Sequence, residues 1–123
     1  MTIKRILFVD DEEDIRTVVK VSLEKVGGFT LQICSSGKEA LQAAPHFRPD
    51  LLLLDVMMPE MDGIATLSAL REISELKEIP VIFLTASVQE EQVAKLKEHG
   101  ALDVIPKPFD PLTLPEVIKS ICE

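Results

Sequence analysis

The chain has no tryptophan, no tyrosine, only two cysteines and no long apolar run, and these absences exclude several classes of protein. Cys34 and Cys122 lie far apart and match no disulfide framework or zinc-binding spacing, so we expect reduced thiols. No apolar stretch approaches the roughly 20 residues that span a bilayer. Residues 1–5 lead directly into a short strand-like run, unlike a signal peptide. We therefore expect a cytoplasmic protein without a membrane partner.

Positive charge is also scarce. Thirteen Lys and Arg face 21 Asp and Glu, which gives a net charge of -8 and disfavours direct binding to nucleic acid or to an anionic membrane. This balance suits a domain that holds a divalent cation or meets a basic partner. Hydrophobic residues make up 46% of the 123, which is enough to build the core of one domain.

Apolar runs and amphipathic segments alternate along the whole chain. We predict strands at residues 4–10, 29–34, 51–55, 80–85 and 102–105. Helices are predicted at residues 12–26, 36–45, 63–76 and 88–99, with a last one after Thr113. Five such strand–helix units with short connections predict an α/β fold, doubly wound, with a five-stranded parallel sheet and helices on both faces.

Local patterns refine these boundaries. In the first helix we expect two faces: Ile15, Val18, Val19 and Leu23 towards the core, and Glu13, Arg16, Lys20 and Glu24 towards solvent. The second helix should end near Pro45, and Asp62 before Gly63 should cap the third. The segment from Thr113 to Glu116 predicts a capping box for the last helix.

The most informative residues follow the predicted strands. Asp55 ends a run of four leucines, and Asp10 and Asp11 follow the first strand. Thr85 ends the fourth strand, and Lys107 comes just after the fifth. In a parallel sheet these strand ends share one edge, where ligands bind and chemistry takes place.

Three carboxylates in one place repel each other, by about 4 kcal/mol for a pair ~4 Å apart at an effective dielectric of 20. Their hard oxygen atoms suit Mg²⁺, and Lys107 can balance the remaining charge or bind a phosphoryl oxygen. Each residue alone also has an ordinary interpretation: Asp11 as a helix cap, Thr85 as a strand residue, Lys107 as part of a turn. The combination favours a functional site.

These motifs together resemble the receiver domain of two-component response regulators, in particular the chemotaxis-type single-domain regulators. The matching pieces stand in order along residues 1–123: Asp10-Asp11, Asp55 with Pro59 and Asp62-Gly63, Thr85-Ala86, and Lys107-Pro108-Phe109. The resemblance implies one receiver domain, free-standing or cut from a longer chain, with a flavodoxin-like sheet in the strand order 2-1-3-4-5.

The resemblance also implies residue roles. Asp55 would accept a phosphoryl group, with Thr85 and Lys107 contacting the phosphoryl oxygens. Mg²⁺ would be held by Asp11 and Asp55 directly, by Asp10 through water, and by the backbone carbonyl of Met57. The bond between Lys107 and Pro108 would be cis.

The implied donor is a histidine kinase or a histidine phosphotransfer protein, and the implied receiver of the signal is an effector protein or output domain. We expect that contact, or a homodimer, to use the helix at 88–99, the strand at 102–105 and the last helix. Val104 stands where many relatives have a Tyr or Phe that turns inward on activation, so the output must be switched in another way.

Three other interpretations stay open from the residues alone. A flavodoxin-like binding module would want small or hydroxyl residues after the first strand, where this chain has four acids. A haloacid-dehalogenase-like phosphotransferase would have its nucleophile after the first strand, in an Asp-x-Asp pattern. A degenerate receiver, acting only as a docking module, would not need an intact set of Asp11, Asp55, Thr85 and Lys107. We expect a signalling switch with no metabolic substrate of its own.

Overall fold

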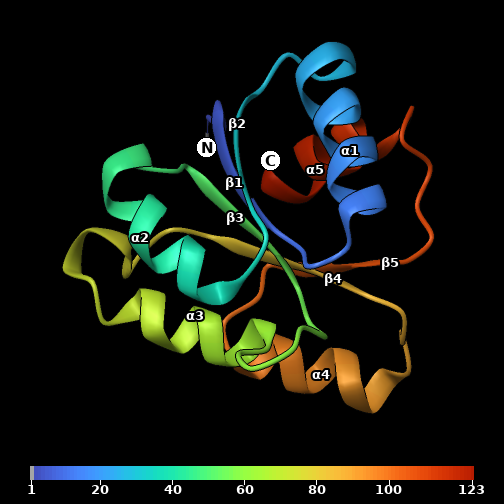
Figure 1. Ribbon diagram of the computed structural model, residues 1–123. Helices are drawn as coiled ribbons and strands as arrows, with labels where there is room; N and C mark the ends of the chain where they lie inside the picture. The colour runs from blue at the N-terminus through green and yellow to red at the C-terminus, as the bar shows by residue number, and fades with distance from the viewer. Residues whose placement is uncertain (1) are drawn as a thin grey trace.

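The computed structural model describes residues 2–123, in which strands and helices alternate as predicted (Figure 1). The strands are β1 (Arg5–Val9), β2 (Thr30–Cys34), β3 (Leu51–Asp55), β4 (Val81–Thr85) and β5 (Asp103–Pro106). The helices are α1 (Glu13–Lys20), α2 (Gly37–Phe47), α3 (Gly63–Arg71), α4 (Glu90–Glu98) and α5 (Leu114–Cys122). A π-helical stretch, η1 (Val21–Val26), continues α1, and a short 3₁₀ turn, η2 (Ser74–Leu76), follows α3.

All five strands are parallel, in the order β2-β1-β3-β4-β5, which confirms the predicted sheet. β3 lies at the centre: Leu52 pairs with Leu7 of β1 on one side and with Val81 of β4 on the other. The leucines of β3 are fully buried, because helices cover both faces of the sheet.

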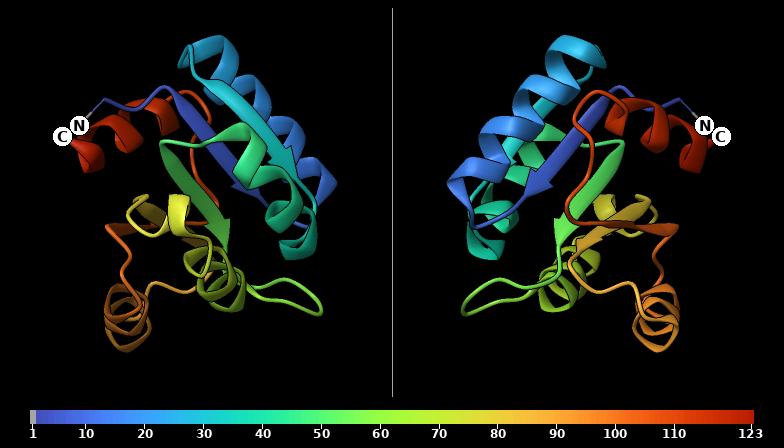
Figure 2. Two further views of the ribbon diagram at one scale, coloured as in Figure 1. Left: turned by 90° about the vertical axis from the view of Figure 1, so that its left-hand side faces the viewer. Right: turned by 90° about the vertical axis from the view of Figure 1, so that its right-hand side faces the viewer.

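The helices form two layers. α1 and α5 lie on one face, and α2, α3 and α4 lie on the other (Figures 1 and 2). Each layer has its own apolar core, since alternate strand residues point to opposite faces. Phe8 packs with Leu23 and Ile118 on the first face, and Phe83 packs with Leu67 and Leu96 on the second. No helix within residues 2–123 has the length and apolar character needed to cross a bilayer.

The first helix differs from the prediction. It is α-helical only to Lys20 and then widens into η1, where the Gly27 N–H donates to the Ser22 carbonyl. Val18, which we expected in the core, is 38% exposed. Arg16, which we expected to face solvent, is half-buried.

α2 ends at Phe47, two residues past Pro45 and so near the predicted end. Two other local predictions were wrong. The predicted helix 63–76 is broken after Arg71, whose guanidinium donates to the carbonyls of Leu76 and Ile79 and folds the chain back. Thr113 accepts no capping bond, because its backbone is helical (φ -103°, ψ -14°) rather than extended, and its hydroxyl donates to the Asp110 carbonyl.

Candidate functional site

Asp55 is the last residue of β3 and lies at the carboxyl edge of the sheet. It is only 3% exposed, because the next helix begins very close to it. That approach requires glycine at position 63, where a Cβ would clash with the Asp55 carbonyl oxygen. Asp62 caps the helix as predicted, accepting a hydrogen bond of 2.8 Å from the Ala65 N–H. β3 and α3 therefore hold the Asp55 carboxylate in a fixed, nearly dry position.

The two acids after β1 lie in different environments. Asp10 is fully buried, and its Oδ1 accepts a hydrogen bond of 2.9 Å from the Glu12 N–H. Asp11 is exposed. It does not cap the first helix, because Glu12 occupies the N-cap position and no side chain accepts a capping bond there. The Asp11 carboxylate therefore remains available for other contacts.

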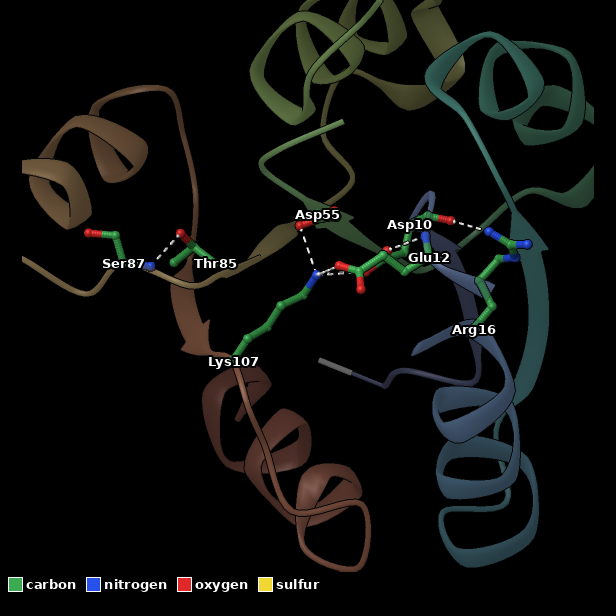
Figure 3. A network of polar contacts seen from close by, with 7 residues as sticks. All are labelled: Asp10, Glu12, Arg16, Asp55, Thr85, Ser87 and Lys107. Atoms are coloured by element: carbon green, nitrogen blue, oxygen red, sulfur yellow. Dashed lines mark hydrogen bonds and ion pairs between the residues drawn. The ribbon is translucent and has the colours of Figure 1, made fainter. Parts of the chain in front are cut away.

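Lys107 joins the acids. Its Nζ lies 2.9 Å from Asp10 Oδ2 and 3.1 Å from Asp55 Oδ1, and 3.8 Å from Glu12 Oε1 at the edge of the site (Figure 3). The side chain is 14% exposed, so these ion pairs are largely shielded from water. The bond between Lys107 and Pro108 is cis, as predicted.

Burial and charge shift the protonation of this network. Burial, together with repulsion from Asp10, raises the pKa of Asp55 to about 6, although the Lys107 ammonium partly offsets the rise. Burial alone would lower the pKa of Lys107, but its bonds to the carboxylates of Asp10 and Asp55 outweigh that effect and raise it. Lys107 therefore stays charged at neutral pH, and Asp55 is mostly ionised there.

The same acids could hold a metal ion. Asp10, Asp11 and Asp55 each offer a carboxylate oxygen, and these three atoms lie within 4.8 Å of one another. A set made only of carboxylate oxygens fits a hard cation such as Mg²⁺. Met57 follows two residues after Asp55, in the loop that reaches out beyond β3 (Figure 2), and its side chain is 75% exposed.

Thr85 stands apart from the acids. It is the last residue of β4, and its Oγ1 accepts a hydrogen bond of 3.1 Å from the Ser87 N–H in its own loop (Figure 3). It also lines a pocket of about 350 Å³ between the β3–α3 loop and α4, whose walls include Val56, Ile64 and Leu96. Val104 lies in β5 beside Phe83 and is partly buried against the core below α4.

Sequence reasoning missed Arg16 as a residue of this site. Its Nη1 donates a hydrogen bond of 2.9 Å to the main-chain carbonyl of Asp10 (Figure 3). The only indication in the sequence is its position one helical turn after Glu12, on the side of α1 that begins beside the acids.

Comparison with known proteins agrees with this geometry. The family model for the response regulator receiver domain matches residues 6–119, and the chain belongs to this family. It is a receiver domain of the two-component response regulator class, and this assignment favours a signalling receiver over a haloacid-dehalogenase-like enzyme.

Two curated relatives are similar over most of the chain. One is the alkaline phosphatase synthesis transcriptional regulatory protein PhoP of Bacillus subtilis, 40% identical over 96% of this chain but only 48% of the relative. Against several such regulators the chain spans half of their length or less. The other is an uncharacterized 14.6 kDa protein of Leptolyngbya boryana, 37% identical over 95% of this chain and 88% of the relative.

Among solved structures, the chemotaxis response regulator CheY4 of Vibrio cholerae superimposes with a TM-score of 0.89. It is 33% identical, and the match covers 98% of this chain and 99% of that one. The predicted fold and family are therefore confirmed, and the individual residue roles remain predictions.

Proposed function

We propose that this receiver domain is a phosphoacceptor switch in which Asp55 takes a phosphoryl group from a phosphohistidine. The observation that supports it most directly is the Lys107 ammonium between the buried carboxylates of Asp10 and Asp55. A buried ion network at a sheet edge stabilises a fold less well than apolar packing would. Its presence therefore favours a role in the reaction over a role in stability.

Asp55 is the nucleophile in this proposal. One of its carboxylate oxygens forms a bond to phosphorus while the P–N bond of the donor breaks, and the bonding electron pair leaves with the imidazole. No proton has to be removed from Asp55, because a pKa of about 6 leaves the group mostly ionised at pH 7.5. β3 and Gly63 keep the nucleophile in one orientation, which lowers the entropic part of the barrier.

The charge that reaches the site with the phosphoryl group needs compensation. Lys107 already lies within 3.1 Å of Asp55 and can pair with a phosphoryl oxygen, and the Thr85 hydroxyl can donate to another. Mg²⁺ held by Asp11 and Asp55, with Asp10 and the Met57 carbonyl in support, would supply the remaining positive charge.

The donor in this proposal is a histidine kinase or a histidine phosphotransfer protein. Receiver domains of this family act with such kinases and with effector domains, and the PhoP relative carries the name of a transcriptional regulator. For this chain we propose an effector or a second copy that binds the surface of α4, β5 and α5. The domain then acts as a signalling switch without a metabolic substrate of its own.

Intact-mass spectrometry with acetyl phosphate and Mg²⁺ tests the proposal. We expect one added phosphoryl group of about 80 Da, blocked by EDTA and absent from Asp55→Asn, since only a positioned carboxylate forms the bond. Asp50→Asn is the matched control, because Asp50 lies at the opposite end of β3 and accepts bonds from the Lys4 and Arg5 N–H groups. Labelling that persists in Asp55→Asn would show the assignment to be wrong.

A further inference from the structure

Arg16 links α1 to the buried end of β1. Its guanidinium crosses from the helix and donates a 2.9 Å hydrogen bond to the carbonyl oxygen of Asp10, six residues earlier (Figure 3). The side chain is half-buried, so the bond is not freely exchanged with water. Arginine keeps its charge at any pH a protein meets, which makes the bond a permanent charge-assisted one.

Every other polar group of Asp10 is also engaged. Its N–H donates to the Cys34 carbonyl of β2 at 3.1 Å and so continues the strand ladder. Its carboxylate accepts from Glu12 and from Lys107. The carbonyl lies beyond the last paired residue of β1, where the ladder no longer supplies a donor, and Arg16 takes that role.

The carbonyl of Asp10 belongs to the peptide unit from which Asp11 extends. A hydrogen bond to that oxygen fixes the plane of the peptide, and with it the direction in which the Asp11 side chain leaves the backbone. Asp11 is exposed, so no packing around its side chain fixes this direction. Its carboxylate oxygen nevertheless lies within 4.8 Å of those offered by Asp10 and Asp55.

We propose that Arg16 is a positioning residue for the cation site: through the Asp10 carbonyl it holds the Asp10–Asp11 peptide so that both carboxylates face Asp55. This inference rests on the proposed function, because it assigns a cation to the three acids. Removing a group that orients a metal ligand commonly lowers the affinity for the metal by about 10- to 100-fold.

The rival explanation is purely structural: Arg16 satisfies a buried carbonyl and stabilises the start of α1. The two explanations differ in what Arg16→Met changes. That variant keeps the long apolar stem and removes the charge and the donors, whereas Arg16→Lys keeps the charge and one donor. Lys20→Met is the matched control, since Lys20 is one turn further along the same helix and exposed.

Mg²⁺ is titrated into the unphosphorylated proteins by calorimetry or by amide NMR shifts, because the chain has no Trp or Tyr to report binding. We expect Arg16→Met to weaken Mg²⁺ binding by roughly 10-fold, Arg16→Lys by no more than about 3-fold, and Lys20→Met hardly at all. Phosphorylation of Arg16→Met by acetyl phosphate should return to the wild-type rate at saturating Mg²⁺. Melting temperatures without Mg²⁺ are recorded in parallel.

A melting temperature that falls while Mg²⁺ binding of Arg16→Met equals that of Lys20→Met would overturn the proposal and leave Arg16 a structural role. If Arg16→Met does not fold, the test compares Arg16→Gln with Arg16→Lys. The proposal then requires the uncharged variant, Arg16→Gln, to bind Mg²⁺ more weakly than Arg16→Lys does. A wild-type protein that takes up no phosphoryl group would instead contradict the proposed function. Asp55-dependent labelling with normal Mg²⁺ binding in Arg16→Met would contradict this inference alone.

Discussion

The carboxyl edge of the sheet has two halves that are held in different ways. In the first, Asp10 after β1 and Asp55 at the end of β3 are buried, and Lys107 after β5 joins them through ion pairs of 2.9 and 3.1 Å. In the second, the Thr85 hydroxyl at the end of β4 has one hydrogen bond, to its own loop, and Thr85 borders a pocket of about 350 Å³. We call these the acid half (Asp10, Asp11, Asp55 and Lys107) and the hydroxyl half (Thr85 to Val88).

This difference suggests separate roles for the two halves: phosphoryl transfer in the acid half and the conformational response in the hydroxyl half. The acid half has its groups in place before any ligand arrives, as a site for phosphoryl transfer needs. The hydroxyl half has few contacts to break and free volume beside it, so a small gain in free energy can move it. A ligand shifts such an equilibrium only by its different affinity for the two states, and a phosphoryl oxygen within reach of Thr85 would provide that difference.

The largest expected effect comes from removing the cation of the acid half. Lys107→Met should leave the buried carboxylates of Asp10 and Asp55 without a counter-charge, at a cost of about 3 kcal/mol in the free energy of unfolding at pH 7.5. Part of that loss should return at pH 5, where Asp55 takes up a proton. Urea unfolding followed by circular dichroism measures both values.

Lys119→Met is the control for Lys107→Met, because its pair with Glu116 is exposed and 3.9 Å long. A surface pair of this kind contributes about 0–1 kcal/mol. If Lys107→Met unfolds at the same urea concentration as Lys119→Met at pH 7.5, the acid half does not depend on its ammonium as we describe.

The two neighbouring acids should separate stability from metal binding. Asp10→Ala removes the bonds to the Glu12 N–H and to Lys107, so we expect a loss of about 2 kcal/mol in stability. Asp11→Ala, at an exposed position, should change stability by less than about 0.5 kcal/mol. Asp11→Ala should nevertheless weaken Mg²⁺ binding more than Asp10→Ala does. Calorimetric titrations that show the opposite order would contradict the assignment of Asp11 as a direct ligand.

A smaller effect concerns pH. The pKa of Asp55 is about 6 in the folded protein and about 3.9 in an unfolded chain, so the folded state binds a proton more tightly. This contribution to stability is complete below pH ~4 and is lost as the pH rises through 6. Between pH 7.5 and pH 5, Asp55 should therefore add roughly 1 kcal/mol of stability. Asp55→Asn should lack that increment, and an unchanged pH profile in the variant would rule out Asp55 as its source.

Much of the acid half could be predicted from sequence. Four leucines before Asp55 identify a strand buried on both faces, and a parallel sheet brings the ends of such strands to one edge. The contact from Arg16 to the Asp10 carbonyl could not be predicted, because a side-chain bond to the main chain leaves no periodic pattern. The exposure of Val18 was missed for a similar reason: apolar spacing does not reveal which turns a neighbouring element covers.

The predicted helix boundaries were wrong where a side-chain contact outweighs the local helix preference of the sequence. Arg71 ends α3 by donating to carbonyls further along the chain, a contact that helix propensity does not include. Thr113 has the sequence of a cap, but its backbone is helical rather than extended, and its hydroxyl donates to the Asp110 carbonyl and accepts no bond from the N–H groups of α5. Both corrections leave the site unchanged, since they lie away from the strand ends.

The smallest expected effect is on the hydroxyl half, and it tests how the signal leaves the site. Val104 has no ring to turn inward, so we expect the Thr85 hydroxyl to carry the change to Ala86, Ser87 and the start of α4. Val88, 54% exposed just before α4, would move with them. We expect Thr85→Ala still to be phosphorylated, though more slowly, but to lose the amide shifts of residues 86–90 that we expect a phosphoryl mimic to cause in the wild type. Val104→Ala should retain them with little change. If Val104→Ala loses the shifts and Thr85→Ala retains them, the response passes through β5 and the two halves are not divided as we propose.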